Sequence, residues 1–594
     1  MSNIRTMNQI KSAEKESRYE KLKRLAKQGE AFYVSRGQEK KDDIKTNPVL
    51  VLASLHGSPV PTYYEGLVVA RQISIGNDVY LGINDREPGF QKLVIQTAER
   101  NKELLEELFT DSQEQALIGN FHSENNVDEF LAKNPDSKTT QYLPSDCADR
   151  EYLRAKGCQE LDDVKLFSEL DKVSTFGWLS SVLRNKQDLE ILEKVSQKVK
   201  QRTGYTDSEI QEVIRKAKSL IVRTDIIKPS NIIELLNQAI NEDFVLLKKN
   251  GASGTGVESA SRKECNKLSE VQKNIIIDSI LHLYEALING TLSQPHNFNL
   301  YHKLYILLQD WKIDTTALKF DILERVSATG NNTLAAFAIF NMFAVKHRYE
   351  SWAKFKKDLE QGLLIMQKGV ANAVEGSYNL ARVEQESGLP EYVMTAISEQ
   401  LVVNNSHAGN QRIIKEFDSE TVDTNDAIQL CLELMLEKIN QDNRINNPEK
   451  EYEIDNIKLP YMGWDFLENK DGVQLIELNA RETGMAMFYK KYVNIVLKLH
   501  PKLIDKQFFG CNLKLNDDPS SINNPKSVKI LIQKAKQFNQ KHPDLVFVPT
   551  SIFAFPPEAK DKQGTYAIGI FVPKKNNLTI KQILELRNQF DWSF

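Results

Sequence analysis

The sequence of 594 residues has few cysteines, and they lie far apart. No two of the five form a C-x-x-C pair, so neither a zinc site nor a disulfide framework is expected. An odd number of scattered thiols suits a reducing compartment, and we therefore predict a cytoplasmic protein. The five are Cys147, Cys158, Cys265, Cys431 and Cys511.

The chain also lacks a long apolar run and an excess of one charge. The most apolar window, NTLAAFAIFNMFAV at 332–345, is too short for a membrane span and is typical of a buried helix. The first thirty residues lack the apolar core of a signal peptide, although secretion without a cleaved signal stays open. With 77 basic and 81 acidic residues, the net charge of −4 favours neither nucleic acid nor a membrane as partner.

The alternation of apolar runs with turn residues predicts an α/β multidomain protein. A chain of this length exceeds one hydrophobic core, so two to four domains are expected. Strand and helix signals alternate first, which favours a doubly wound parallel unit. Helical spacing dominates the middle, and strands return afterwards. The expected units are an N-terminal helix and linker (1–45), the doubly wound domain (46–170), a mixed lobe (171–267), a helical insertion (268–370), a second mixed lobe (371–520) and a small α+β module (525–594).

A glycine-rich loop follows an apolar strand in FVLLKKNGASGTGVESA, residues 244–260. It is neither a Walker loop nor a G-x-G-x-x-G turn. Glycine lets backbone N–H groups approach an anion closely, the hydroxyls add donors, and Lys248 could reach a phosphate as a point charge. The other interpretation is an ordinary surface hairpin. The loop residues in question are Gly251, Ser253, Gly254, Thr255 and Gly256.

A second informative segment, YMGWDFLENKDGVQLIELNARETG, reads as two strands joined at Asp471-Gly472. Strand side chains alternate between faces, so Glu477 and Asn479 should share one face. By the same alternation we expect Val473 and Leu475 on that face. Polar groups such as these, placed among apolar neighbours, need hydrogen-bonding or charged partners.

Asp465 on the first strand can lie across from this pair. Two carboxylates and an amide oxygen form the hard oxygen cluster that suits Mg²⁺. Arg481 follows in phase with Asn479, and it could neutralise a transferring phosphate or hold a substrate carboxylate. The other interpretation is a surface hairpin whose polar face is solvated.

Both segments, in this order, resemble motifs of the ATP-grasp superfamily. DFVLLKKNGASGTGV is similar to its lysine and glycine-loop segment, and GWDFLENKDGVQLIELNARETG to its metal-binding hairpin with an E-x-N-x-R signature. IVRTDIIKPSNIIELLNQAI fits the strand and helix that lead into the lysine. The resemblance covers roughly residues 180–500, with the helical insertion as a departure. It implies an ATP-grasp fold of two α+β lobes, preceded by a pre-ATP-grasp domain.

The resemblance also implies roles for the nucleotide-binding residues. Lys248 would contact the α- and β-phosphates of ATP, and the glycine loop would form a lid over them. The family usually has proline after this lysine, but Lys249 stands here, so either lysine is a candidate. Lys186 and Lys172 are candidates for a second family lysine. The stretch YNLARVEQESG is our candidate for the adenine-binding hinge.

On the metal side, the resemblance implies that Asp465, Glu477 and Asn479 hold one or two Mg²⁺ (or Mn²⁺) ions. Arg481 would support an acyl-phosphate step. Gln400, Gly409 and Asn410 are similar to a segment of the peptide-ligase branch of the superfamily, and His407 beside them is a candidate substrate contact.

The implied activity is that of an ATP-dependent carboxylate–amine ligase. An amino acid or peptide would be phosphorylated on its carboxylate and joined to an amine, with release of ADP and phosphate. The alternative is an ATP-binding regulatory or interaction protein that keeps the fold without ligation, with its helical insertion docking a partner. The sequence specifies neither substrate, and a homodimer is one option for the assembly.

Overall fold

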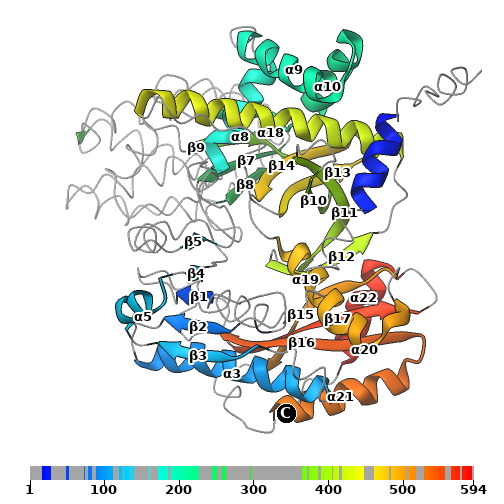
Figure 1. Cartoon of the computed structure of the whole chain (residues 1–594). Helices are drawn as coiled ribbons and strands as arrows, with labels where there is room; N and C mark the ends of the chain where they lie inside the picture. Colours follow the sequence, from blue (N-terminus) through cyan, green and yellow to red (C-terminus); the bar gives the residue numbers. More distant parts are fainter. Residues whose placement is uncertain are drawn as a thin grey trace, which may run out of the picture.

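The computed structural model describes three β-sheets with the helices that cover them (Figure 1). The described residues are 17–27, 49–52, 73, 78–82, 88–110, 119–124, 126–135, 137–139, 159–160, 172–184, 189–226, 244–249, 257–261, 282, 294–295, 364–370, 373–384, 390–403, 406–413, 418–446, 461–479, 483–503, 506–516, 527–555, 564–574 and 578–590. None of the helices within these ranges is both long enough and apolar enough to cross a membrane.

The N-terminal sheet has five parallel strands in the order β3-β2-β1-β4-β5. The chain order reverses at β1, which lies between β2 and β4, so the sheet has the doubly wound order that the sequence predicts. Helices α3 (Pro88–Leu108) and α5 (Val127–Lys133) accompany it. The strands are β1 (Val49–Leu52), β2 (Val79–Gly82), β3 (Phe121–Glu124), β4 (Lys138–Thr139) and β5 (Gln159–Glu160).

A second sheet has four antiparallel strands in the order β6-β9-β7-β8. Lys248 lies opposite Val257, so the glycine-rich segment 250–256 connects β7 to β8. The strands are β6 (Thr224–Ile226), β7 (Phe244–Lys249), β8 (Val257–Ser261) and β9 (Leu364–Lys368).

Strand β9 corrects one expectation. We predicted that roughly residues 268–370 are almost all helical and included the run around Leu364 in a helix, but Leu364–Lys368 is a strand between β6 and β7. A short apolar run such as LLIM does not distinguish a buried strand from a buried helix by periodicity. Here β9 pairs on both sides with strands that are distant in the sequence, and this pairing makes the segment a strand. Nearly all the rest of that segment lies outside the described residues.

The largest sheet has eight strands in the order β14-β13-β10-β11-β12-β15-β17-β16, with antiparallel pairing throughout. Its last two strands come from the C-terminal α+β region, whose helices are α21 (Ser527–Lys541) and α22 (Ile580–Gln589). The strands are β10 (Val374–Glu384), β11 (Pro390–Val403), β12 (Ser406–Ile413), β13 (Tyr461–Asn469), β14 (Gly472–Asn479), β15 (Phe509–Asn516), β16 (Leu545–Phe555) and β17 (Gly564–Pro573).

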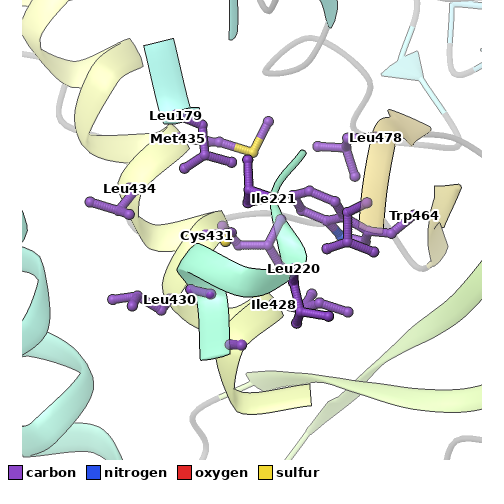
Figure 2. Packing of buried hydrophobic residues seen from close by; sticks show 14 of the residues in the cluster. Leu179, Leu220, Ile221, Ile428, Leu430, Cys431, Leu434, Met435, Trp464 and Leu478 are labelled. Atoms are coloured by element: carbon purple, nitrogen blue, oxygen red, sulfur yellow. The ribbon is translucent and has the colours of Figure 1, made fainter. Parts of the chain in front are cut away.

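Four helices build the main core against one face of β10, β11, β13 and β14. In α10 the apolar side chains recur every three or four residues and are buried, as one face of an amphipathic helix requires. Trp464 of β13 lies at the centre, packed near Leu220 and Leu478 (Figure 2). The helices are α8 (Lys172–Arg184), α9 (Leu189–Thr203), α10 (Asp207–Leu220) and α18 (Ser419–Asn446).

Helix α8 packs on both the four-stranded and the eight-stranded sheet. Its Phe176 ring lies 5.8 Å from the Trp464 ring, centroid to centroid. The next residue, Gly177, is so close to β6 and β9 that a Cβ atom there would collide with Ile226 and approach Ile365. The lack of a side chain at Gly177 therefore allows one helix to hold two sheets together.

Replacing Gly177 by valine should lower the free energy of unfolding by about 1–3 kcal/mol, the usual cost of overpacking a core. Valine would force Ile226 and Ile365 apart. Chemical denaturation measures the change, and Gln197→Val on the exposed side of α9 controls for the helix propensity of valine. Equal stability of the two variants would contradict the close packing of α8.

The opposite face of the large sheet is covered by α19 (Gly484–Lys491), a π-helical turn (Tyr492–Val496) and α20 (Leu497–Leu499). These elements share a core with α3 of the N-terminal domain. The side-chain amide of Asn101 in α3 donates to Ile552 O and accepts from Ile552 N, as a neighbouring strand would. Helix α3 is thus packed against strand β16 of the C-terminal α+β region.

Candidate active site

The hairpin β13–β14 brings together the three predicted metal ligands. Asp465 lies directly opposite Glu477, and Gly463 lies opposite Asn479. The amide Nδ2 of Asn479 donates to Oδ2 of Asp465 at 2.7 Å. Oδ1 is therefore the atom through which Asn479 can contact a cation.

A β-bulge in β14 corrects the expected face of its apolar residues. Asp465 pairs with Glu477, but the next residue, Phe466, pairs with Leu475, so Ile476 is an extra residue in β14. Alternation is interrupted there, and Leu475 points into the helix-covered core while Glu477 points away from it. The expectation that Val473 and Leu475 share the face of Glu477 was wrong because the bulge interrupts the alternation. No residue pattern in the segment predicts a bulge.

Asp465 and Glu477 begin a row of polar residues that crosses five strands. Each member lies opposite the next in the antiparallel register, so all of them share one face of the sheet. That face is the one opposite the Trp464 core. The row runs Glu477, Asp465, Ser377, Ser398 and Arg412.

A second row beside it includes Asn479, Gly463 and Asn379. Thr483 caps helix α19, accepting a hydrogen bond from Ala486 N at 3.0 Å, and donates to Oδ1 of Asn379 at 2.8 Å. A Cβ atom on Gly463 would overlap the methyl group of Thr483. The glycine therefore lets the start of α19 sit directly on the sheet, next to the carboxylates.

The donor set fits a hard divalent cation. Asp465 and Glu477 are partly exposed, whereas Asn479 is buried. Within the described residues no group of three or more His, Cys, Asp and Glu side chains could hold a metal, so a cation here would have two carboxylates and one amide oxygen. Mg²⁺ commonly uses one or two carboxylates and completes its shell with water and phosphate oxygens.

Replacing Asn479 by aspartate should destabilise the metal-free protein by about 1–3 kcal/mol, because a buried acceptor would then face Oδ2 of Asp465 without a donor. A divalent cation between the carboxylates would offset the repulsion. We therefore expect added Mg²⁺ to raise the melting temperature of Asn479→Asp more than that of the wild type. An equal Mg²⁺ response would contradict a cation at this position. Asn469→Asp near the exposed turn is the matched control.

The two predicted segments are joined through the backbone. Ile221 forms a parallel bridge with Leu475 of β14, and Val222 N donates to Leu475 O at 3.3 Å. Two residues later the chain enters β6 of the sheet that carries the β7–β8 hairpin. The strand pair with the glycine-rich connection is therefore anchored to the edge of the acidic hairpin.

Several predicted residues lie outside what the structure describes. These are Lys186, Gly251, Ser253, Gly254, Thr255, Gly256 and Arg481, together with the side chains of Lys172, Lys248, Lys249 and His407. Gln400 lies opposite Asn410 between β11 and β12, two pairs along from Ser398 and Arg412. The candidate adenine hinge spans β10 and the segment before β11.

Sequence reasoning missed Ser377, Asn379, Arg412 and Tyr489, which lie on the same face as the carboxylates or against it. Arg412 lies 4.7 Å from the centre of the Tyr489 ring. Asn379, Arg412 and Tyr489 are among the residues that line a small cavity between the sheet and α19. Polar residues within otherwise apolar strands were the available signal, but their common row depends on pairings between distant strands.

No protein-family model and no curated protein matches the chain. Among solved structures, the chain is similar to N5-carboxyaminoimidazole synthetase from Staphylococcus aureus complexed with ADP, with a TM-score of 0.41, 8% identity and coverage of 92% of this chain and 98% of that one. For a biotin carboxylase complex with β,γ-ATP from Campylobacter jejuni, the TM-score is 0.39 and the identity 9%, with coverage of 92% of this chain and 91% of that one. For a candidate ATP-grasp superfamily protein from Archaeoglobus fulgidus, the TM-score is 0.33 and the identity 10%, with coverage of 79% of this chain and 94% of that one. These similarities are distant, and the roles of individual residues depend on the geometry of this chain.

Proposed function

We propose that this chain is an ATP-dependent carboxylate–amine ligase of the ATP-grasp type. The observation that carries the proposal is the pairing of Asp465 with Glu477, with Asn479 hydrogen-bonded to Asp465, on the face of the hairpin opposite the Trp464 core. That hairpin is anchored to the sheet whose β7–β8 connection is the glycine-rich segment. The two motifs that resemble the superfamily in sequence thus belong to linked elements of the fold.

In this proposal Asp465, Glu477 and Oδ1 of Asn479 hold one or two Mg²⁺ or Mn²⁺ ions. The cation, when bound, draws negative charge from the β- and γ-phosphates of ATP. Lys248 or Lys249 and the loop of Gly251, Ser253, Gly254, Thr255 and Gly256 bind the phosphates. Lys186 is the candidate for a second lysine contact.

The chemistry needs no side-chain nucleophile. An oxygen of the substrate carboxylate attacks the γ-phosphorus, and the bond to the β-phosphate oxygen breaks to release ADP. The amine nitrogen then attacks the acyl carbon, phosphate leaves, and the amine loses a proton. The residues of the site position these groups and stabilise charge, and Arg481 is assigned to the acyl-phosphate step.

The remaining predictions follow from this assignment. The parallel sheet of β1–β5 is the proposed pre-ATP-grasp domain, and amino acids or peptides are the proposed substrates in the cytoplasm.

The test of the proposed function is to incubate the protein with ATP, Mg²⁺ and pooled amino acids and peptides, and to detect ADP together with a new amide product. If no pool raises turnover and Asp465→Ala changes nothing, the proposal is wrong. Nucleotide binding without turnover would instead support a regulatory ATP-binding protein.

A further inference from the structure

The cavity under helix α19 lies at the far end of the polar row from the acidic hairpin. It is lined by Asn379, Thr395, Ala396, Arg412, Met485, Ala486 and Tyr489. Asp465 and Arg412 are three strand pairings apart in the row, which corresponds to roughly 14 Å at about 4.8 Å between neighbouring strands. A substrate lying along the row could therefore contact both ends.

Arg412 is held in a fixed orientation on the wall of this cavity. Its side chain is only 6% exposed, and the guanidinium lies over the ring of Tyr489, which is itself 8% exposed. Stacking on an aromatic ring restrains the plane of the guanidinium, and the N–H donors of a guanidinium lie in that plane. Such a restrained fork matches the two oxygens of a carboxylate.

The rest of the cavity offers few charges. Met485 and Ala486 form an apolar wall, and the polar atoms of Asn379 are engaged by Thr483, Ser377 and Ser398. Arg412 is the one charged residue among the described residues that line the cavity, so a carboxylate there would lie beside a cation. The phosphorylated carboxylate, by contrast, must lie near Asp465 and Glu477, where the cation neutralises the phosphates.

We propose that Arg412, backed by Tyr489, binds a second carboxylate of the acyl substrate, distinct from the one that is phosphorylated. This inference rests on the proposed function and narrows its substrate class to dicarboxylates, such as acidic amino acids or peptides that end in one. Arg412 is then a specificity-determining residue, and Tyr489 is a positioning residue that acts through it.

The experiment measures binding to the full-length protein by calorimetry, with and without Mg²⁺ and a nonhydrolysable ATP analogue. The probes are L-aspartate, L-glutamate and L-alanyl-L-glutamate, each compared with the compound in which the side-chain carboxylate is an amide. O-phospho-L-serine tests for phosphate in place of carboxylate. At least one acid should bind, roughly 10- to 100-fold more tightly than its amide, because a hydrogen-bonded charge pair is lost in the amide.

Arg412→Met should reduce the affinity for the acid to that of the amide, and Arg412→Lys should be intermediate because lysine keeps the charge without the fork. Tyr489→Leu should weaken binding of the acid but not of the amide, and Tyr489→Phe should leave binding of the acid unchanged. Arg215→Met, an exposed arginine on α10, is the matched control. The Tyr489 pair keeps the test valid if Arg412→Met fails to fold.

Three results would overturn the inference: no acid in the panel binds, acids and amides bind alike, or the arginine variants leave the ratio unchanged. Preference for O-phospho-L-serine would overturn the carboxylate assignment. Failure of the wild-type protein to bind the nucleotide analogue would contradict the proposed function instead. Intact nucleotide binding without discrimination between acid and amide would contradict only this inference.

Discussion

Asp465→Asn should lower the rate of ATP-dependent product formation at least about 100-fold. A metal-bound carboxylate contributes several kcal/mol to stabilising the phosphate group during its transfer, and each step of about 1.36 kcal/mol of barrier corresponds to a tenfold change in rate. The substitution keeps the size of the side chain and its hydrogen-bond acceptor for Asn479, so the hairpin should stay folded. The measurement is ADP release at saturating ATP and Mg²⁺. Glu477→Gln, directly opposite in the register, should have an effect of the same order.

The control for this pair is Asp471→Asn in the exposed turn of the same hairpin, which should leave the rate unchanged. A residual rate within a few-fold of wild type in Asp465→Asn would contradict the assignment of the hairpin as the metal site. A large loss in Asp471→Asn would show that the assay reports on hairpin stability instead.

Arg18→Met should destabilise the protein by about 3–5 kcal/mol, since removing one partner leaves buried charges uncompensated. Arg18 is the first residue of the N-terminal helix at 18–27, and its guanidinium binds Glu391 at 2.5 Å and Asp426. Both carboxylates are less than 5% exposed. Figure 1 shows this dark blue helix beside α18 and β11, the elements that carry the two acids.

Denaturant titration of the full-length chain measures this change, and Arg215→Met, whose arginine pairs with Glu212 at the surface, is the matched control with an expected cost below about 1 kcal/mol. Equal costs for the two arginines would contradict a structural role for the N-terminal helix. Leu22 and Leu25 of that helix are fully buried against Val383 and Val393, so docking has an apolar component as well.

The same cluster predicts a loss of stability at alkaline pH. Tyr205 donates its hydroxyl to Asp426, and burial, followed by the charge of Asp426, raises the pKa of Tyr205 above its usual value near 10. The folded state therefore favours the neutral phenol, and this contribution is complete below about pH 10 and is lost as the pH rises toward the folded-state pKa. Tyr205→Phe should remove that part of the pH dependence.

Local patterns were sufficient for much of the fold and for part of the site. The turn at Asp471-Gly472 and the apolar run before the glycine loop correctly predict the β13–β14 hairpin and strand β7. Alternating strand and helix signals predict a parallel, doubly wound unit, and β1 to β5 form a parallel sheet. Asp465 and Glu477 were found because one hairpin brings them together, and hairpins are encoded by neighbours in sequence.

What the sequence did not reveal depends on contacts between distant segments. The bulge at Ile476 and the strand β9 arise from pairing with other strands, which overrides local alternation and helical spacing. Arg412 lies in an ordinary polar stretch, and only the register through β10 and β11 places it in line with Asp465. Its stacking on Tyr489 likewise joins residues from two separate elements.

The most direct test of the central claim is calorimetric titration of the full-length protein with a nonhydrolysable ATP analogue, with and without Mg²⁺. If Asp465 and Glu477 hold a cation that neutralises phosphate charge, the wild type should bind the analogue at least about tenfold more tightly with Mg²⁺ than without it. Metal ligation and nucleotide binding would then be coupled. Glu477→Gln should lose most of that gain. Binding that is independent of Mg²⁺, or equal in Glu477→Gln and the wild type, would contradict the claim.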